Sequence, residues 1–349
     1  MEINKNTINS SQIAKLAGVS RSTVSRVINN YNNVPQETRE KILEVIKQYN
    51  YYPNISAQVL KGKRTNTIGL FMISGNLITD NLLNNYSVAA VIENAAQRGY
   101  HVLSYIINDT RDTDTIQNVK EVFHQRRIDG GIFKGGANHE PLIEELIAEG
   151  FLIGIIDQDL PGRMETNRMV FNFESKKTAE NAIDYVVGLN HRKIAIINGD
   201  LNKYSGMQKY QGFLNGLEKN SSEIEKYWII QGEFNKGSGY AGMSKFLKGA
   251  AEIPTAVCAA NDSIAFGAIE AINEFGLKVP DDISVTGIDD HILSQYYKPP
   301  LTTFRVDFGE IYRKLTLSTI EAIERGVNEK FIKIEYDTTF IERESCRRI

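Results

Sequence analysis

The sequence predicts two parts of different class: a small all-α head, followed by a larger two-lobed α/β core with parallel sheets. Apolar residues recur at helical spacing between residues 13 and 49. From residue 67, short apolar β-rich runs alternate with longer amphipathic stretches, the pattern of a Rossmann-like fold. Charge changes at the same place. Residues 1–64 carry ten Lys or Arg and four Glu, a net charge of +6, so the rest of this −3 chain carries −9.

Length and composition bound the class of protein. The chain has 349 residues, of which 42% are hydrophobic and 24% charged, as in soluble globular proteins of two or three domains. No apolar run approaches the roughly 20 residues that span a bilayer, and the polar N-terminus lacks a signal-peptide core. Cys258 and Cys346 are the two cysteines, too few for a disulfide scaffold. We therefore expect a cytoplasmic protein without membrane segments, with Cys258 buried.

Residues 14–26 (AKLAGVSRSTVSR) predict two short helices joined by a tight turn. Ala14 is small enough to let the helices touch, and Gly18 can adopt the left-handed conformation that ends the first. Ser20 can cap the second helix, and Val24 falls on its inner face towards Leu16 and Ala17. This is the layout of a DNA-binding helix-turn-helix. The alternative is a solvated helical hairpin, and the +6 charge favours a partner rich in phosphate.

Further sequence features mark where the helices of the head begin and where the head ends. Asn9 with Gln12 resembles a capping box that opens the first helix, and Pro35 suits the first turn of a third helix. Residues 51–54 stop that helix, and 56–61 form a helix-compatible segment too short to be stable alone. We therefore expect a head over residues 1–53, a hinge helix and linker over 54–66, and a core over 67–349.

The core predicts strands that alternate with helices. Because there are too many strands for one compact sheet, we expect two similar lobes, the second beginning near residue 169. Helices are predicted over 91–98 and 177–189, and one or two strands within 332–342. The other predicted strands are 67–72, 102–107, 131–134, 152–157, 169–173, 193–198, 228–231, 255–260 and 284–288.

Motifs along nearly the whole chain resemble those of the LacI/GalR family of bacterial transcriptional regulators. This resemblance implies a three-helix head, a hinge helix and a two-lobed periplasmic-binding-protein-like core. It also implies an N-lobe of about 67–168 plus 306–331 and a C-lobe of about 169–305 plus 332–345. The motifs are 14–29 (AKLAGVSRSTVSRVIN), 37–41 (ETREK), 52–54 (YPN), 64–69 (RTNTIG), 98–100 (RGY), 129–130 (DG), 191–195 (HRKIA), 261–262 (ND), 287–290 (GIDD), 300–303 (PLTT) and 343–345 (RES).

On the DNA side, the resemblance implies that Arg21, Ser22 and Arg26 face base edges in a pseudo-palindromic operator bound by a homodimer. Arginine can hold guanine O6 and N7 with two bonds, and serine can donate or accept. In this family the paired hinge helices enter the minor groove, where Leu60 would wedge a base step and Lys61 would flank it. Ser20, Thr23, Ser25 and Asn29 are expected to contact phosphates, which position without specifying.

On the ligand side, the resemblance implies an effector cleft between the lobes. Phe173 and Phe234 match positions that pack against the effector, and Asn261, Asp289 and Asp157 match polar positions. Each has a structural alternative: the Phe residues as core, Asn261 as a helix cap, and Asp289 as part of a turn after a strand.

Three lysines distinguish this cleft. Lys209 stands where the family commonly has arginine, and Lys134 and Lys203 also align with cleft positions. They predict an anionic effector, a sugar phosphate or sugar acid, unless Asp157, Glu174 and Asp289 neutralise them. The effector is otherwise expected to be a plain sugar.

Two other functions compete with this prediction. A solute-binding protein or sensor could use the same core, but it would have no use for a basic helix-turn-helix. A Rossmann-type enzyme would need a phosphate-binding or metal motif, and the chain has no Gly-x-Gly-x-x-Gly after the first predicted strand, no Walker motif and no His-Glu-x-x-His. We therefore expect a dimeric repressor of carbohydrate-utilisation genes, without catalytic residues, cofactor or metal.

Overall fold

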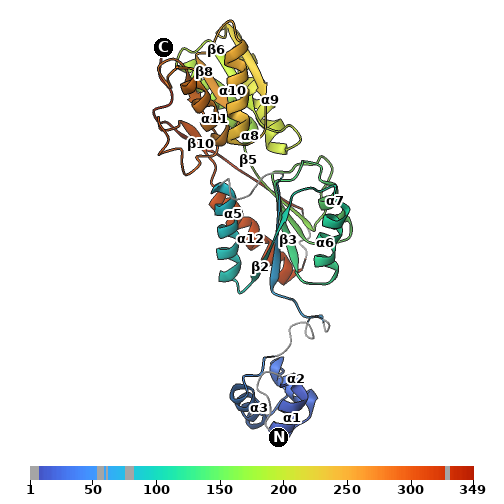
Figure 1. The fold of residues 1–349 in the computed structure, drawn as a ribbon. Coiled ribbons are helices and arrows are strands. Elements are labelled where there is room, and N and C mark those ends of the chain that lie inside the picture. Colours follow the sequence, from blue (N-terminus) through green and yellow to red (C-terminus); the bar gives the residue numbers. More distant parts are fainter. Residues whose placement is uncertain (1–7, 53–58, 60–61, 75–81, 327–330) are drawn as a thin grey trace. The chain divides into compact units, whose positions relative to one another are not determined.

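A computed structural model describes residues 8–52, 59, 62–74, 82–326 and 331–349 (Figure 1). The chain divides into two compact units between Thr65 and Asn66. The predicted hinge segment 56–61 lies outside the described residues except for Val59, and Leu60 and Lys61 fall in the part that is not described.

The head forms the predicted helices around their expected caps. The Asn9 side chain accepts from the backbone of Gln12, whose own side chain accepts from Asn9 N at 2.8 Å, so the capping box is confirmed. Gly18 ends the first helix with φ of 65°, and the Ser20 hydroxyl caps the second by accepting from Thr23 N at 3.1 Å. The described helices are α1 (Ser10–Ala17), α2 (Arg21–Ile28) and α3 (Gln36–Gln48).

A small apolar cluster holds these helices together. Val24 of α2 is fully buried with Ala17 of α1 and Ile42 of α3. The prediction was wrong in two details. Leu16 is 36% exposed and lies outside the buried cluster, so the inner face of α1 is narrower than its sequence indicates. Pro35 occupies the N-cap of α3 rather than its first turn.

The first lobe of the core is built on a parallel sheet of six described strands in the order β11-β5-β4-β3-β1-β2. Helices cover both faces, as the near-continuous apolar runs of the central strands require. Helices α5 (Leu82–Gln97) and α12 (Phe308–Arg325) pack on one face, and α6 (Thr113–His124) and α7 (Pro141–Ala148) on the other (Figure 1). The strands are β1 (Thr67–Ile73), β2 (His101–Ile107), β3 (Gly130–Lys134), β4 (Ile153–Ile156), β5 (Arg168–Phe173) and β11 (Ile332–Tyr336).

The second lobe repeats this design on a smaller scale. Its parallel sheet has the order β7-β6-β8-β9, and β10 (Thr303–Arg305) pairs antiparallel with β12 (Thr339–Ile341) beside it. Cys258 in β8 is fully buried, as predicted. The other elements are β6 (Lys193–Asn198), β7 (Lys226–Gln231), β8 (Ala256–Ala259), β9 (Ser284–Thr286), α8 (Ser175–Gly188), α9 (Tyr204–Lys219), α10 (Lys236–Gly249) and α11 (Asp262–Glu274).

The predicted lobe boundaries were wrong for two strands. Strand β5 pairs with β4, and β11 pairs with β5, so both belong to the first lobe and not to the C-lobe expected from residue 169 and over 332–345. The segment between β4 and β5 contains no helix, so β5 looks in the sequence like the start of a new alternation. Strand β11 returns to the first sheet from more than 150 residues further along the chain, a pairing that local sequence does not signal.

The chain crosses between the lobes after β5, after β10 and after β11, at residues 174, 306–307 and 337–338. The C-terminal part therefore contributes to both lobes, as the resemblance implied. In each parallel sheet, the loops that follow the strands gather at the carboxyl edge, where open α/β sheets bind ligands. Lys134, Asp157 and Phe173 stand at the ends of β3, β4 and β5.

Candidate nucleic-acid interface and ligand cleft

The outer face of α2 presents the predicted base-reading residues. Arg21, Ser22 and Arg26 are exposed, whereas Val24 and Val27 on the same helix are buried. Arg21 Nε donates to Ser10 Oγ at 3.0 Å, which orients its guanidinium along the start of α1. Two arginines and a hydroxyl on one exposed helix face are the groups that major-groove readout uses.

Two of the four predicted phosphate contacts, Ser20 and Thr23, form a hydroxyl cluster with Ser22 at the N-terminus of α2. Ser20 Oγ lies 2.7 Å from Ser22 Oγ and 2.8 Å from Thr23 Oγ1. At the other end, Asn29 Nδ2 donates to Ser25 Oγ at 3.3 Å. The N-terminal end of a helix carries partial positive charge, which together with hydroxyl groups suits a phosphate oxygen.

All eight predicted effector residues line one cavity, which we call the inner cavity. Its volume is about 180 Å³. The sequence missed five further lining residues: Gly135, Ile156, Ser205, Phe308 and Tyr312. The predicted residues that line it are Lys134, Asp157, Phe173, Lys203, Lys209, Phe234, Asn261 and Asp289.

Hydrogen bonds join the two lobes at one side of the inner cavity. Asp157, from the end of β4, accepts from Ser205 N at 2.6 Å and from Ser205 Oγ at 2.8 Å in the first turn of α9. Lys203 Nζ donates to Gly135 O after β3. The first lobe therefore caps the N-terminus of a helix in the second, and the Asp157 carboxylate balances that end of the helix dipole.

Lys209 is buried between two aromatic rings. Its Nζ lies 5.2 Å from the ring centroids of both Phe173 and Phe234, and it donates to Ala260 O at 2.7 Å. Asp289 Oδ1 is 4.0 Å away. Burial lowers the pKa of Lys209, and the nearby carboxylates oppose that shift. The two Phe residues thus serve as cavity walls, whereas their structural alternative was core packing alone.

Asn261 and Asp289 reach the inner cavity from the second lobe. Asn261 Oδ1 accepts from Ile264 N at 2.9 Å and caps α11, so the helix-cap alternative is confirmed for its carbonyl oxygen. Asp289 has φ of 121°, a conformation that L-residues rarely adopt and that clusters at ligand sites. Burial raises the pKa of Asp289 to about 6, against the opposing effect of Lys209.

Lys134 enters the inner cavity from β3 of the first lobe. Its Nζ donates to Ser87 Oγ at 2.9 Å and lies 5.6 Å from the Tyr312 ring centroid. Burial lowers its pKa to about 8. Three lysines and two aspartates line the inner cavity, and Glu174 does not line it. The lysines therefore exceed the lining carboxylates by one.

Comparisons with known proteins agree with this architecture. Residues 11–54 match the model of bacterial regulatory proteins of the lacI family, and residues 183–346 match a periplasmic binding protein-like domain. The transcriptional repressor PurR of Haemophilus influenzae (strain PittEE) is 31% identical over 342 residues, which cover 97% of this chain and 98% of that protein. The probable repressor ExuR of Bacillus subtilis (strain 168) is 31% identical over 97% of this chain and 98% of its own length.

The chain belongs to the lacI family of bacterial regulatory proteins. It is a DNA-binding transcription regulator, in a family made of regulators rather than enzymes. A crystal structure of the lac repressor dimer bound to operator and the anti-inducer ONPF has a TM-score of 0.81 and 27% identity, over 97% of this chain and 99% of that one. Within the described ranges, no helix is long and apolar enough to cross a membrane.

This lacI-family chain also contains a buried hydrogen-bond network around Asp262 that the sequence did not reveal. Asp262, fully buried, accepts from His291 N at 2.7 Å, from Ser294 Oγ at 2.6 Å and from Thr303 Oγ1 at 2.5 Å. Burial raises the pKa of Asp262 to about 8, and Asp289 adds to the shift. The network fixes the loop that carries Asp289. The Asn-Asp pair at 261–262 is the available signal, although in the sequence it indicates a ligand contact or a helix cap at Asn261 and gives no sign of a buried network.

Proposed function

We propose that the head binds a pseudo-palindromic operator as part of a homodimer, and that a small effector in the inner cavity changes operator affinity. The observation that carries this proposal is the gathering of eight residues, chosen from sequence, around one cavity between lobes. The relatives named repressors, and the lac repressor dimer on its operator, support repression as the outcome. A regulator of bacterial chromosomal DNA acts in the cytoplasm.

The proposed DNA contacts follow from α2 and the hinge. Arg21, Ser22 and Arg26 read bases, and four phosphate contacts position the helix: Ser20, Thr23, Ser25 and Asn29. Leu60 and Lys61 remain proposed minor-groove contacts. One three-helix head buries too little surface for operator-grade affinity, which favours a dimer on two half-sites.

The proposed effector is a sugar-like molecule that carries an acidic group. The genes that the protein is proposed to repress are those of carbohydrate use. Lys203 and Lys209 donate to main-chain carbonyls, the Asp157 carboxylate accepts from Ser205, and the Asp289 carboxylate lies 4.0 Å from Lys209 Nζ. With three lysines and two aspartates in its lining, the inner cavity as a whole is one negative charge short of balance. An acidic group on the ligand would supply it, while Asp289 and Asn261 bond hydroxyl groups.

A thermal-shift screen of sugars, sugar phosphates and sugar acids tests this function. A ligand of the folded state raises the melting temperature by mass action. Hits are then added to the protein on a duplex selected from a random pool, and operator affinity is measured by fluorescence anisotropy. We expect an acidic sugar to bind, with affinity that falls as salt rises, and to change operator affinity. Binding of sugars without any change in operator affinity would support a solute sensor instead.

A further inference from the structure

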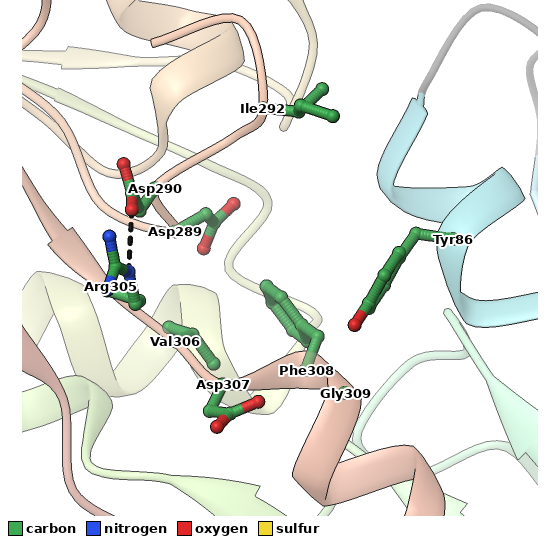
Figure 2. Close-up of a pocket in the computed structure, with 9 residues that line it drawn as sticks. All are labelled: Tyr86, Asp289, Asp290, Ile292, Arg305, Val306, Asp307, Phe308 and Gly309. Atoms are coloured by element: carbon green, nitrogen blue, oxygen red, sulfur yellow. Dashed lines mark hydrogen bonds and ion pairs between the residues drawn. The ribbon is translucent and has the colours of Figure 1, made fainter. Parts of the chain in front are cut away.

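A groove on the second lobe lies apart from the ligand cleft. The open space drawn in Figure 2 shares Asp289 and Phe308 with the inner cavity, so it is part of that cleft. The separate groove has a volume of about 610 Å³ and is lined by residues of β7, of α10 and of the loop that follows α10. We call it the edge groove, because β7 is the outermost strand of the second parallel sheet.

The outer side of β7 offers backbone groups to another strand. Lys226 N donates to Arg192 O at 3.2 Å, in the segment that leads into β6, and backbone groups alternate sides along a strand. The N–H and C=O groups of Tyr227, Ile229 and Gln231 therefore point away from β6. Across the described part of the chain, none of these outward groups has a backbone hydrogen-bond partner.

The two edges of this sheet differ in their protection. At the β9 edge, Val285 N donates to Ser345 O at 2.8 Å, so the C-terminal segment covers that side. Proteins commonly protect open edges with proline, bulges or unpaired charges. Strand β7 has no proline and pairs with β6 in continuous register, and the charge of Lys226 is bonded to Glu252 Oε2 at 3.0 Å. This edge is therefore suited to the addition of a strand.

Apolar side chains stand on both faces of β7. Trp228 packs against Phe246 of α10 with ring centroids 5.5 Å apart, and Ile230 lies on the same face of the strand. On the opposite face, Tyr227 is 52% exposed and Ile229 is half-buried. Aromatic and β-branched residues form cross-strand pairs that stabilise sheets. An added strand would therefore gain side-chain contacts on both faces.

Strand β7 is complementary to a second copy of itself. In an antiparallel pair centred on Ile229, the outward backbone groups of Ile229 bond those of the same residue in the other copy. The outward groups of Tyr227 bond those of Gln231 in the other copy, and Trp228 stands opposite Ile230. A two-fold axis makes the two halves of this contact identical.

Charge also favours this pairing. In the same register, Lys226 stands opposite Gly232 of the other copy, so no like charges meet across the strand pair. Like charges directly opposite each other destabilise a sheet, and their absence suits a contact between identical strands. Lys193 and Lys226 are both paired with Glu252 of their own chain, which leaves no carboxylate at this end that calls for a foreign basic strand.

We propose that two homodimers associate through β7, with the two β7 strands antiparallel about a two-fold axis at Ile229. Two four-stranded parallel sheets then form one continuous sheet across the contact. The head joins the core through β1 of the first lobe, whereas β7 belongs to the second lobe. Pairing through β7 therefore leaves the first lobe available for the homodimer that the proposed function requires. Because a contact of one strand pair is small, the association is weak and depends on protein concentration.

Two double variants at exposed positions test the register. Residue 227 stands opposite residue 231 of the other copy, and this pair occurs twice in each contact. Tyr227→Lys/Gln231→Lys, the like-charge variant, places two positive charges at each pair. Tyr227→Lys/Gln231→Glu, the opposite-charge variant, changes the same two positions but makes each pair attractive. Gln117→Lys/Asn118→Lys is the matched control, because it adds the same charge as the like-charge variant at exposed positions of α6.

The test is sedimentation velocity on the full chain over a concentration series, with circular dichroism to confirm that each variant is folded. We expect the wild-type assembly to double in mass as concentration rises. The opposite-charge variant should reach the doubled mass at about fivefold lower concentration, and the like-charge variant should need at least about tenfold more protein. Added salt should reduce the gain of the opposite-charge variant. The control should behave as the wild type does.

The outcomes separate this inference from the proposed function. Equal association of the like-charge and opposite-charge variants would overturn the register. If the opposite-charge variant never doubles in mass, the contact itself is wrong, and a strand from a different protein becomes the better candidate for the edge groove. The mass of the like-charge variant tests the homodimer separately. A mass of one chain would contradict the proposed homodimer in solution, while doubling of the opposite-charge variant would still support the β7 contact.

Discussion

The two proposed sites of this regulator are built in opposite ways. The proposed DNA contacts of the head lie on one short stretch, 20–29, and the helix caps and buried positions of that stretch follow from neighbours within a few residues. The inner cavity gathers residues between 134 and 312 from both lobes, and each lobe alone supplies part of it. A local site can be altered without disturbing the rest, whereas a cleft made by two lobes couples ligand binding to their arrangement. This difference suits a protein in which a ligand controls a separate DNA-binding surface.

The largest expected effect tests whether the two regions are independent. Val24→Asp places an unpaired carboxylate at a fully buried position in the head. Burial of an unpaired charge costs about 3–5 kcal/mol, enough to unfold a three-helix unit. We expect operator binding to be abolished and the effector-induced thermal shift to remain. Leu16→Asp, at an exposed position of the same cluster of helices, should keep the head folded. Loss of the effector shift in Val24→Asp would mean that the core depends on the head.

The next prediction breaks the cleft instead. Asp289→Ala removes a buried carboxylate that can accept two hydroxyl bonds, and charge-assisted bonds contribute about 1.5–3 kcal/mol each. Effector affinity should fall at least about tenfold, and operator affinity without effector should not change. Calorimetry and anisotropy measure the two quantities on the same preparation. Asp290→Ala is no substitute for this variant, because Asp290 pairs with Arg305 and Arg343. If Asp289→Ala binds the effector as tightly as the wild-type chain, the effector binds outside the inner cavity.

Base reading by α2 is expected to have a smaller and more selective effect. Arg26→Ala should cost about 1–3 kcal/mol on the selected operator and much less on random DNA. Lys47→Ala removes the same charge from the last turn of α3, and any loss it causes should be equal on both duplexes. Competition anisotropy with the two duplexes gives the ratio of operator affinity to random-DNA affinity directly. If Arg26→Ala weakens binding to both duplexes equally, Arg26 contacts phosphate and does not read sequence.

The smallest predicted effect concerns pH and the loop that carries Asp289. Because burial raises the pKa of Asp262 from its ordinary value of 3.8 to about 8, between these pH values the folded state keeps a proton that the unfolded state has released. Its contribution to stability is thus present below pH 4 and is lost as pH rises to about 8. Asp262→Asn should flatten this decline in melting temperature, whereas Glu218→Gln on the exposed face of α9 should not. An unchanged slope in Asp262→Asn would show that Asp262 stays ionised.

Sequence reasoning reached different depths in the two regions. The head was predicted almost to the residue. The signals at Asn9, Gly18 and Ser20 depend on hydrogen bonds to residues no more than four positions away, so they can be seen in the local sequence. In the core, individual strands were found, but β5 and β11 were assigned to the wrong lobe. The absence of a helix between β4 and β5 makes β5 look like the start of a new alternation, and the pairing of β11 with the distant β5 leaves no local signal. Ser205 and Phe308 were missed for the same reason: the three-dimensional crossing of the chain, rather than their own sequence context, brings them to the cavity.

The central claim is that ligand binding in the core and operator binding by the head are coupled, and linkage tests it most directly. Effector affinity is measured for the free protein and for the operator complex, and operator affinity is measured with and without saturating effector. Coupling requires that both ratios equal the same factor, which for allosteric proteins is about 5–150. We predict one common factor in the wild-type chain, and in Asp289→Ala the effector concentration needed to saturate the effect rises at least about tenfold. A factor of one in both directions, with effector bound, would contradict the account.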